Sequence, residues 1–180
     1  TKQVTVAVQD PMAEIRDVTF SPDSKWLTYS RPANNEHNII YVYDIAGKKE
    51  YPVTDKWYDS GSPVFSSDGK YLIFSSARDF NPTYGSLEWN HVYNNMGGVY
   101  LALLSKDTPS PFLEKDAKVA VKEYNAKKEE PKKEVKKETA SETPAIKIDV
   151  EGISERIIQL PLAGSRYGNF YGDGNKVYYW

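Results

Sequence analysis

Few residues in this sequence could do acid–base or nucleophilic chemistry. Its two histidines are His37, within the polar run Asn34–Asn38, and His91, in an aromatic-rich stretch near Glu88. A histidine can act as a general base or a metal ligand, but a lone one in such a stretch more often packs or hydrogen-bonds. We therefore expect His37 at a solvated hairpin tip and His91 in a packing role.

The serines and carboxylates also lack the surroundings that catalysis needs. No serine stands in a Gly-x-Ser-x-Gly elbow or near a His–Asp arrangement. Asp23 and Asp68 occupy equivalent positions of a repeat, so we interpret both as turn residues. The segment Gly172–Gly174 aligns with the same turns, and no strand–loop–helix context makes it a nucleotide-binding loop. Because the chain also has no cysteine, we predict no catalytic, cofactor-binding or metal-binding residue.

A group of aromatic residues could instead bind peptide. These residues do not follow strand alternation, so we expect them in loops, where exposed rings can contact a ligand. Covering of the sheet's own exposed edges explains them equally well, and none is assigned to a site. The group comprises Trp57, Tyr58, Tyr84, Trp89 and Tyr93.

A repeat predicts the elements that carry these residues. Phe20–Leu27, with the sequence FSPDSKWL, recurs 45 residues later as Phe65–Leu72, with the sequence FSSDGKYL, and a degenerate third copy runs from Phe170 to Tyr179. The proline presets a turn, the aspartate can bond the backbone ahead, and the glycine of the second copy tolerates positive φ. Each copy therefore predicts a tight hairpin of two short antiparallel strands.

Further strands follow each hairpin. Ile39–Ile45 and Val99–Leu104 are apolar at nearly every position, as expected of strands covered on both faces. Glu50–Thr54 forms the next strand, and its Pro52 suits an edge. Four short strands in about 45 residues is the period of a propeller blade, whereas a β-sandwich, the alternative, has no reason to repeat a hairpin sequence. The predicted fold is all-β: a β-propeller fragment with four-stranded antiparallel blades, two complete and a third in part.

The repeat divides the chain into four parts. We predict the last strand of a preceding blade in residues 1–10, a blade in 11–58, a second blade in 59–161 with insertions at 78–97 and 106–145, and the first hairpin of a third blade in 162–180. The outer faces of the terminal pieces, including Tyr41, Tyr43 and Val177–Trp180, would then be uncovered. We therefore expect a marginally stable chain or one that self-associates.

Charge and composition narrow the function. Residues 115–143 are a mixture of Lys and Glu with almost no large apolar side chains, so we expect a mobile loop there. The net charge of −2 argues against a nucleic-acid binder. No apolar run approaches the length of about 18 residues that a membrane span needs, so we predict no membrane span.

A family resemblance builds on the repeat. The hairpin motif resembles the repeats of tricorn protease, of the Tol-system periplasmic propeller and of prolyl-oligopeptidase-like enzymes. Three further stretches narrow the choice: Ser76–Pro82, Val99–Phe112 and Ile148–Pro161. In this order, with the charged insertion between the last two, they resemble the second propeller of tricorn-like proteases, over about residues 15–179.

The resemblance implies a function for the parent protein rather than for this segment. It implies a large serine peptidase that degrades peptides, in which the propellers guide or gate substrate access to a separate catalytic domain. The nucleophile and its histidine lie in that domain, so none is carried over to this chain. The implied partners are peptide substrates, the remaining blades and the catalytic domain. The alternative is a non-enzymatic propeller scaffold for protein–protein binding, like the Tol-system propeller. The implied compartment is the cytoplasm, with a periplasmic or exported protein as the alternative.

Overall fold

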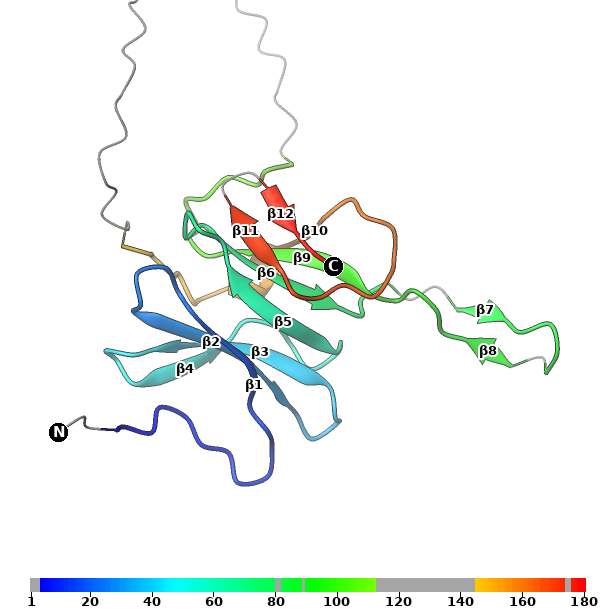
Figure 1. Ribbon diagram of the computed structural model, residues 1–180, viewed down its shortest axis with the longest axis horizontal. Coiled ribbons are helices and arrows are strands. Elements are labelled where there is room, and N and C mark those ends of the chain that lie inside the picture. Colours follow the sequence, from blue (N-terminus) through cyan, green and yellow to red (C-terminus); the bar gives the residue numbers. More distant parts are fainter. Residues whose placement is uncertain (1–3, 80–81, 89, 113–144, 174–175) are drawn as a thin grey trace, which may run out of the picture.

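The first sheet follows directly from the first copy of the repeat. The computed structural model describes residues 4–79, 82–88, 90–112, 145–173 and 176–180. The first blade is a four-stranded antiparallel sheet in sequence order, coloured blue to cyan in Figure 1. Its strands are β1 (Arg16–Phe20), β2 (Trp26–Pro32), β3 (Asn38–Asp44) and β4 (Lys49–Pro52).

The second sheet repeats this arrangement, and a hairpin follows it. The second blade has the strand order β10-β9-β6-β5, and a short 3-10 helix, η1 (Ile153–Arg156), precedes its last strand. The third-blade hairpin pairs two more strands, and a separate hairpin projects from the second blade (Figure 1). The second blade consists of β5 (Ser60–Phe65), β6 (Tyr71–Ser76), β9 (Gly98–Leu103) and β10 (Ile157–Gln159). The third-blade hairpin consists of β11 (Tyr171–Asp173) and β12 (Lys176–Tyr178). The projecting hairpin consists of β7 (Thr83–Tyr84) and β8 (His91–Val92). The predicted fold, two four-stranded blades and part of a third, is confirmed.

The two full copies of the repeat fold into the same turn. Ser21 Oγ donates to Asp23 Oδ1 at 2.7 Å and accepts from the backbone N–H of Trp26 at 3.0 Å. In the second copy, Ser66 Oγ makes the equivalent bonds to Asp68 at 2.6 Å and from Tyr71 at 3.0 Å. The fourth residue after each phenylalanine has positive φ, 57° at Ser24 and 66° at Gly69. The repeat therefore encodes a turn closed by its serine and aspartate side chains.

Apolar side chains fill the spaces on both sides of the second blade. One core lies between the two complete blades, where Ile40 and Val42 of β3 pack in one cluster with Phe74 of β6 and Ala102 of β9. The second core lies on the opposite face, where Ile73, Val99 and Leu101 cluster with Phe170 and partly buried Val177 of the third-blade hairpin. Alternate residues of β6 and β9 therefore enter different cores, which explains why these strands are apolar throughout.

The two ends of the chain differ in how far the structure bears on their expectations. No strand is assigned within residues 4–10, and their place as the last strand of a preceding blade stays a prediction. In the third copy, Gly172 and Asp173 belong to β11 rather than to the turn, since Asp173 pairs with Lys176. The third copy has Tyr171 at the position of Ser21 and Ser66. It therefore lacks the serine hydroxyl that closes the turn in the first two copies.

Two further expectations concern aromatic residues. Tyr84 lies in strand β7 rather than in a loop. Tyr43 was expected on an uncovered face, yet it is only 6% exposed. Side chains of that face cover one another: the rings of Tyr29 and Tyr41 stack at 5.6 Å, and the guanidinium of Arg31 lies 4.5 Å from the Tyr41 ring. The open face is therefore smaller than the strand pattern indicated.

Some expectations fall outside the described residues, among them Trp89 and the Lys/Glu-rich stretch 115–143. Within the part of the chain that the structure describes, we find no helix with the length and apolar character that a membrane crossing requires.

Candidate functional site

The two histidines occupy positions that suit structural roles. His37 lies at the tip between β2 and β3, where its Nδ1 is 3.2 Å from the carbonyl oxygen of Lys56 and 3.3 Å from the Asn35 side-chain amide. His91 lies in β8, and its ring contacts that of Tyr84 at 4.6 Å and that of Tyr93 at 6.3 Å. Neither set of contacts includes a serine hydroxyl or a carboxylate, which a nucleophile–base pair would require.

The first strands of the successive blades lie together and form the inner side of the fragment. Thr19 Oγ1 of β1 donates to the carbonyl oxygen of Pro63 in β5 at 3.1 Å. An isolated parallel bridge then joins Ser66, just after β5, to Gly172 of β11. In a propeller the first strands surround the central channel, so this side would face the channel of a closed propeller.

A matched pair of bulges shapes this inner side. Asp17 in β1 and Ser62 in β5 have positive φ values of 54° and 53°, and the strand pairing shifts at both. The Asp17 carboxylate accepts the N–H of Ser62 and the hydroxyl of Ser30, both at 3.0 Å. These two bulges were not predicted, although the sequence carries their signal: Asp17 and Ser62 stand three positions before the phenylalanines of the repeat, at the same offset of 45.

The bulges border a hollow of about 360 Å³ that we call the inner groove. Among the described residues that line it, Asp17 alone has a charged side chain, and that carboxylate is engaged in the hydrogen bonds given above. Val18, on the exposed edge of β1, is 54% exposed. The lining residues are Asp17, Val18, Thr19, Ser62, Pro63, Val64, Asn169, Phe170 and Trp180. The groove therefore carries one charged side chain, held by hydrogen bonds, and otherwise presents small polar groups beside apolar ones.

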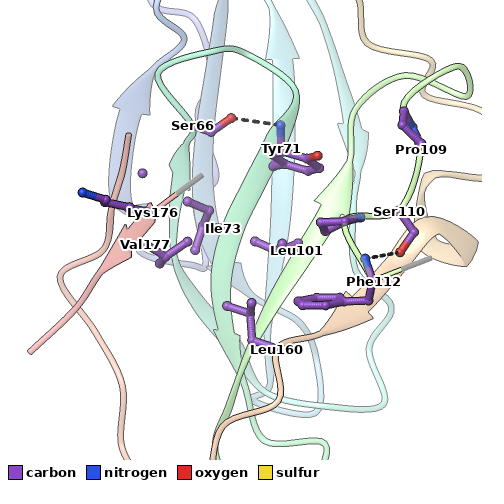
Figure 2. Close-up of a pocket in the computed structure, with 12 residues that line it drawn as sticks. Ser66, Tyr71, Ile73, Leu101, Pro109, Ser110, Phe112, Leu160, Lys176 and Val177 are labelled. Carbon is purple, nitrogen blue, oxygen red and sulfur yellow. Dashed lines mark hydrogen bonds between the residues drawn. The ribbon is translucent and has the colours of Figure 1, made fainter. Parts of the chain in front are cut away.

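A second hollow, which we call the outer cleft, lies between the second blade and the third-blade hairpin. It measures about 500 Å³. Figure 2 shows Val177 on one side, Phe112 on the other, and Ile73 and Leu101 between them. Leu160 closes one end, whereas Ser66 and Tyr71 lie toward the other, joined by a 3.0 Å hydrogen bond (Figure 2). This cleft is an apolar surface beside the edge of β12.

The predicted peptide-binding aromatics do not gather into one site. Trp57 is 74% exposed in the loop before β5, and Tyr58 packs under the guanidinium of Arg78, 5.4 Å from its ring. Tyr84 lies in the projecting hairpin and Tyr93 just beyond it. Arg78 also lies 5.4 Å from the Tyr100 ring, so Tyr58 is part of a packed cation–π arrangement. The structure thus divides these residues between packing and exposed positions.

Known proteins share both the sequence and the fold of this chain. The family described as "Tricorn protease second beta propeller domain" matches residues 1–180. "Tricorn protease homolog 1" of Streptomyces coelicolor is 32% identical over 83% of this chain, and "Tricorn protease homolog" of Saccharolobus solfataricus is 26% identical over 91%. The chain spans only 13% of the length of each of these relatives.

A solved structure gives the same result for the fold. The crystal structure of the tricorn protease superposes on 96% of this chain with a TM-score of 0.70 and 19% sequence identity, and the match covers 15% of that chain. The β-propeller architecture inferred from the repeat is therefore shared with a solved protein. Taken with the match over residues 1–180, these similarities show that the chain belongs to the tricorn protease family, as a second β-propeller domain.

Proposed function

We propose that this chain is a non-catalytic segment of a tricorn-like serine peptidase and that its inner groove guides peptides toward a catalytic domain elsewhere in the parent protein. The observation that carries the proposal is the groove along the first strands of the blades, in which Asp17 is the one charged side chain among the described lining residues. A guide for peptides of many sequences must accept either sign of charge. A lining with only one charged side chain, and that one held in place by hydrogen bonds, offers few groups with which a charged peptide side chain could pair tightly.

The bulges also support guiding over tight binding. An extended peptide can add to a regular open strand edge through a ladder of backbone hydrogen bonds. The shifts at Asp17 and Ser62 interrupt such a ladder on both β1 and β5. A peptide in the groove would therefore make few backbone bonds at a time and could slide along it.

Kinetics of the full-length parent protein test the proposal. Val18→Trp adds an indole to the exposed edge of the groove, and Met12→Trp, at a side chain 93% exposed and outside the groove, is the matched control. We expect Val18→Trp to lower kcat/KM severalfold for unstructured peptides of about 20 residues but not for a dipeptide-sized chromogenic substrate. Equal kcat/KM values for the two variants on the long peptides would contradict a guiding role for the groove.

A further inference from the structure

The two ends of the long insertion in the second blade meet at the end of β9. The backbone N–H of Asp149 donates to the carbonyl oxygen of Leu104 at 2.8 Å. The Asp149 carboxylate accepts the backbone N–H of Lys106 at 2.8 Å and the hydroxyl of Ser105, 44 positions earlier in the sequence, at 3.1 Å. Asp149 belongs to residues 145–156, which we call the returning segment. This one residue therefore binds three groups at the point where the chain leaves β9.

Arg156, at the end of η1, joins the same two parts of the chain. Its Nε donates to the carbonyl oxygen of Leu103 in β9 at 3.2 Å, and its Nη1 donates to that of Glu151 at 2.9 Å. Its Nη2 donates to the carbonyl oxygen of Asp149. The guanidinium thus connects β9 with the turn before η1, immediately ahead of β10.

Apolar side chains of the returning segment pack against both complete blades. Ile153 is 2% exposed and belongs to the core cluster that contains Leu104 and Phe74. Partly buried Ile146 packs against the same cluster, and its backbone N–H donates to Asp23 of the first blade at 2.9 Å. Strand β10 then pairs with β9. Hydrogen bonds and the core therefore hold the returning segment in addition to its covalent connection with β9.

The exposed ion pairs beside these contacts and the covalent connection itself contribute less. Lys106 pairs with Glu151 at 3.3 Å and Lys147 with Asp107 at 2.9 Å, and all four side chains are more than half exposed. A connection of about 40 residues supplies an effective concentration of at most the order of millimolar. Noncovalent contacts with a micromolar Kd would therefore keep the returning segment in place without it.

We propose that Asp149 and Arg156 lock the returning segment onto the second blade, so that the blade stays closed when the chain is cut between Phe112 and Ala145. The lock lets the blade accept a cut at this position without loss of β10 from the sheet. The chain belongs to a protease family, in which a peptidase that cut here would then leave the sheet intact. The lock consists of contacts within this chain, so the proposal depends neither on the rest of the parent protein nor on peptide guiding.

Cutting the full 180-residue chain at one position tests the proposal. A recognition sequence for a site-specific protease replaces residues 126–132, and the cut and uncut forms are compared. At about 10 μM we expect the two pieces to elute together in gel filtration and the amides of β10 to keep their protection from hydrogen exchange. Separation of the pieces, or loss of protection at β10 after the cut, would overturn the proposal.

Substitutions then test whether Asp149 and Arg156 form the lock. In the Asp149→Ala/Arg156→Ala double variant, we expect the two pieces of the cut chain to bind each other with a Kd about tenfold higher or more. Asp107→Ala is the matched control, because it removes only the exposed pair with Lys147, and it should leave this Kd unchanged. Circular dichroism checks that the uncut double variant is folded; should it unfold, the single Asp149→Ala variant gives the same comparison. A Kd equal to that of the unmodified pieces would contradict the assignment of the lock to these residues.

Discussion

Replacing Asp23 by alanine tests how the blades are held together. The Asp23 carboxylate accepts the Ser21 hydroxyl at 2.7 Å and the Lys25 N–H at 3.2 Å, both within its own turn. Its second oxygen accepts the backbone N–H of Ile146 at 2.9 Å, from the segment that leads to the last strand of the second blade. The one side chain therefore closes a turn of the first blade and connects that turn to its neighbour.

Comparison with Asp68 separates these two contributions. Asp68 makes the same two bonds within its turn, to Ser66 at 2.6 Å and from Lys70 N–H at 3.2 Å, and its second oxygen pairs with the exposed Lys70 side chain. At about 1 kcal/mol for each net hydrogen bond, Asp68→Ala should cost about 2 kcal/mol and Asp23→Ala about 3 kcal/mol. The difference of about 1 kcal/mol is the expected contribution of the bond between the blades.

Urea unfolding at pH 7, followed by tryptophan fluorescence, gives these free energies if the transition is two-state. Asp107→Ala is the control, because the carboxylate of Asp107 is 83% exposed and pairs with the exposed Lys147; its cost should stay below about 0.5 kcal/mol. A free energy of unfolding for Asp23→Ala equal to that of the control would refute the reasoning. Equal losses for Asp23→Ala and Asp68→Ala would refute the connection between the blades.

Three further predictions concern pH, packing and activity. Burial alone would raise the pKa of both Asp23 and Asp68, but hydrogen bonds, led by those from Ile146 and Ser66 respectively, outweigh it and lower both pKa values below the ordinary 3.8. The stability that these carboxylates contribute is present above 3.8 and is lost as the pH falls through their folded-state pKa. The urea midpoint should therefore drop below about pH 4, and it should drop less in the Asp23→Asn/Asp68→Asn double variant. Gly172→Ala should destabilise the chain by about 1–3 kcal/mol, since the new Cβ would lie 2.5 Å from Ile73 Cδ1 and 3.2 Å from the Ser66 Cα. The control Gly85→Ala, whose new Cβ would meet no atom nearer than 3.4 Å, should change the melting temperature little. The purified chain should not hydrolyse an unstructured peptide; hydrolysis abolished by a serine-directed inhibitor would show a nucleophile in this segment.

The repeat predicted the fold well because it encodes its own turns. Phe20–Leu27 and Phe65–Leu72 carry the serine and aspartate that close the hairpins, so the spacing of 45 residues is enough to predict two blades. The third copy was located, but its aspartate was misassigned: the alignment placed Asp173 in a turn, whereas it lies in β11 and pairs with Lys176. The turn residues, rather than the hydrophobic pattern, therefore explain both why the first two hairpins were predicted correctly and why the turn of the third was misplaced.

The inner groove was harder to predict, because it depends on contacts between blades. Asp17 looks like an ordinary polar residue in the sequence, and its role becomes visible only where its carboxylate meets the Ser62 N–H of the next blade. Likewise, strand periodicity placed Tyr43 on an uncovered face, whereas its side chain is only 6% exposed, because periodicity assigns a residue to a face but does not encode how well that face is covered. The family resemblance supplied the expectation of a guide, whereas the geometry supplies the residues to test.

Photo-crosslinking in the full-length parent protein tests the guiding role most directly. A photoreactive amino acid replaces Val18 in the inner groove or, as the control, Leu87 at the end of the projecting hairpin, which is 93% exposed. The protein's catalytic nucleophile is removed so that a long unstructured peptide remains intact. We predict that the peptide crosslinks at position 18, that excess unlabelled peptide suppresses the crosslink, and that position 87 labels weakly. Equal labelling at both positions, or labelling at position 87 alone, would contradict the proposal that peptides pass along the inner groove.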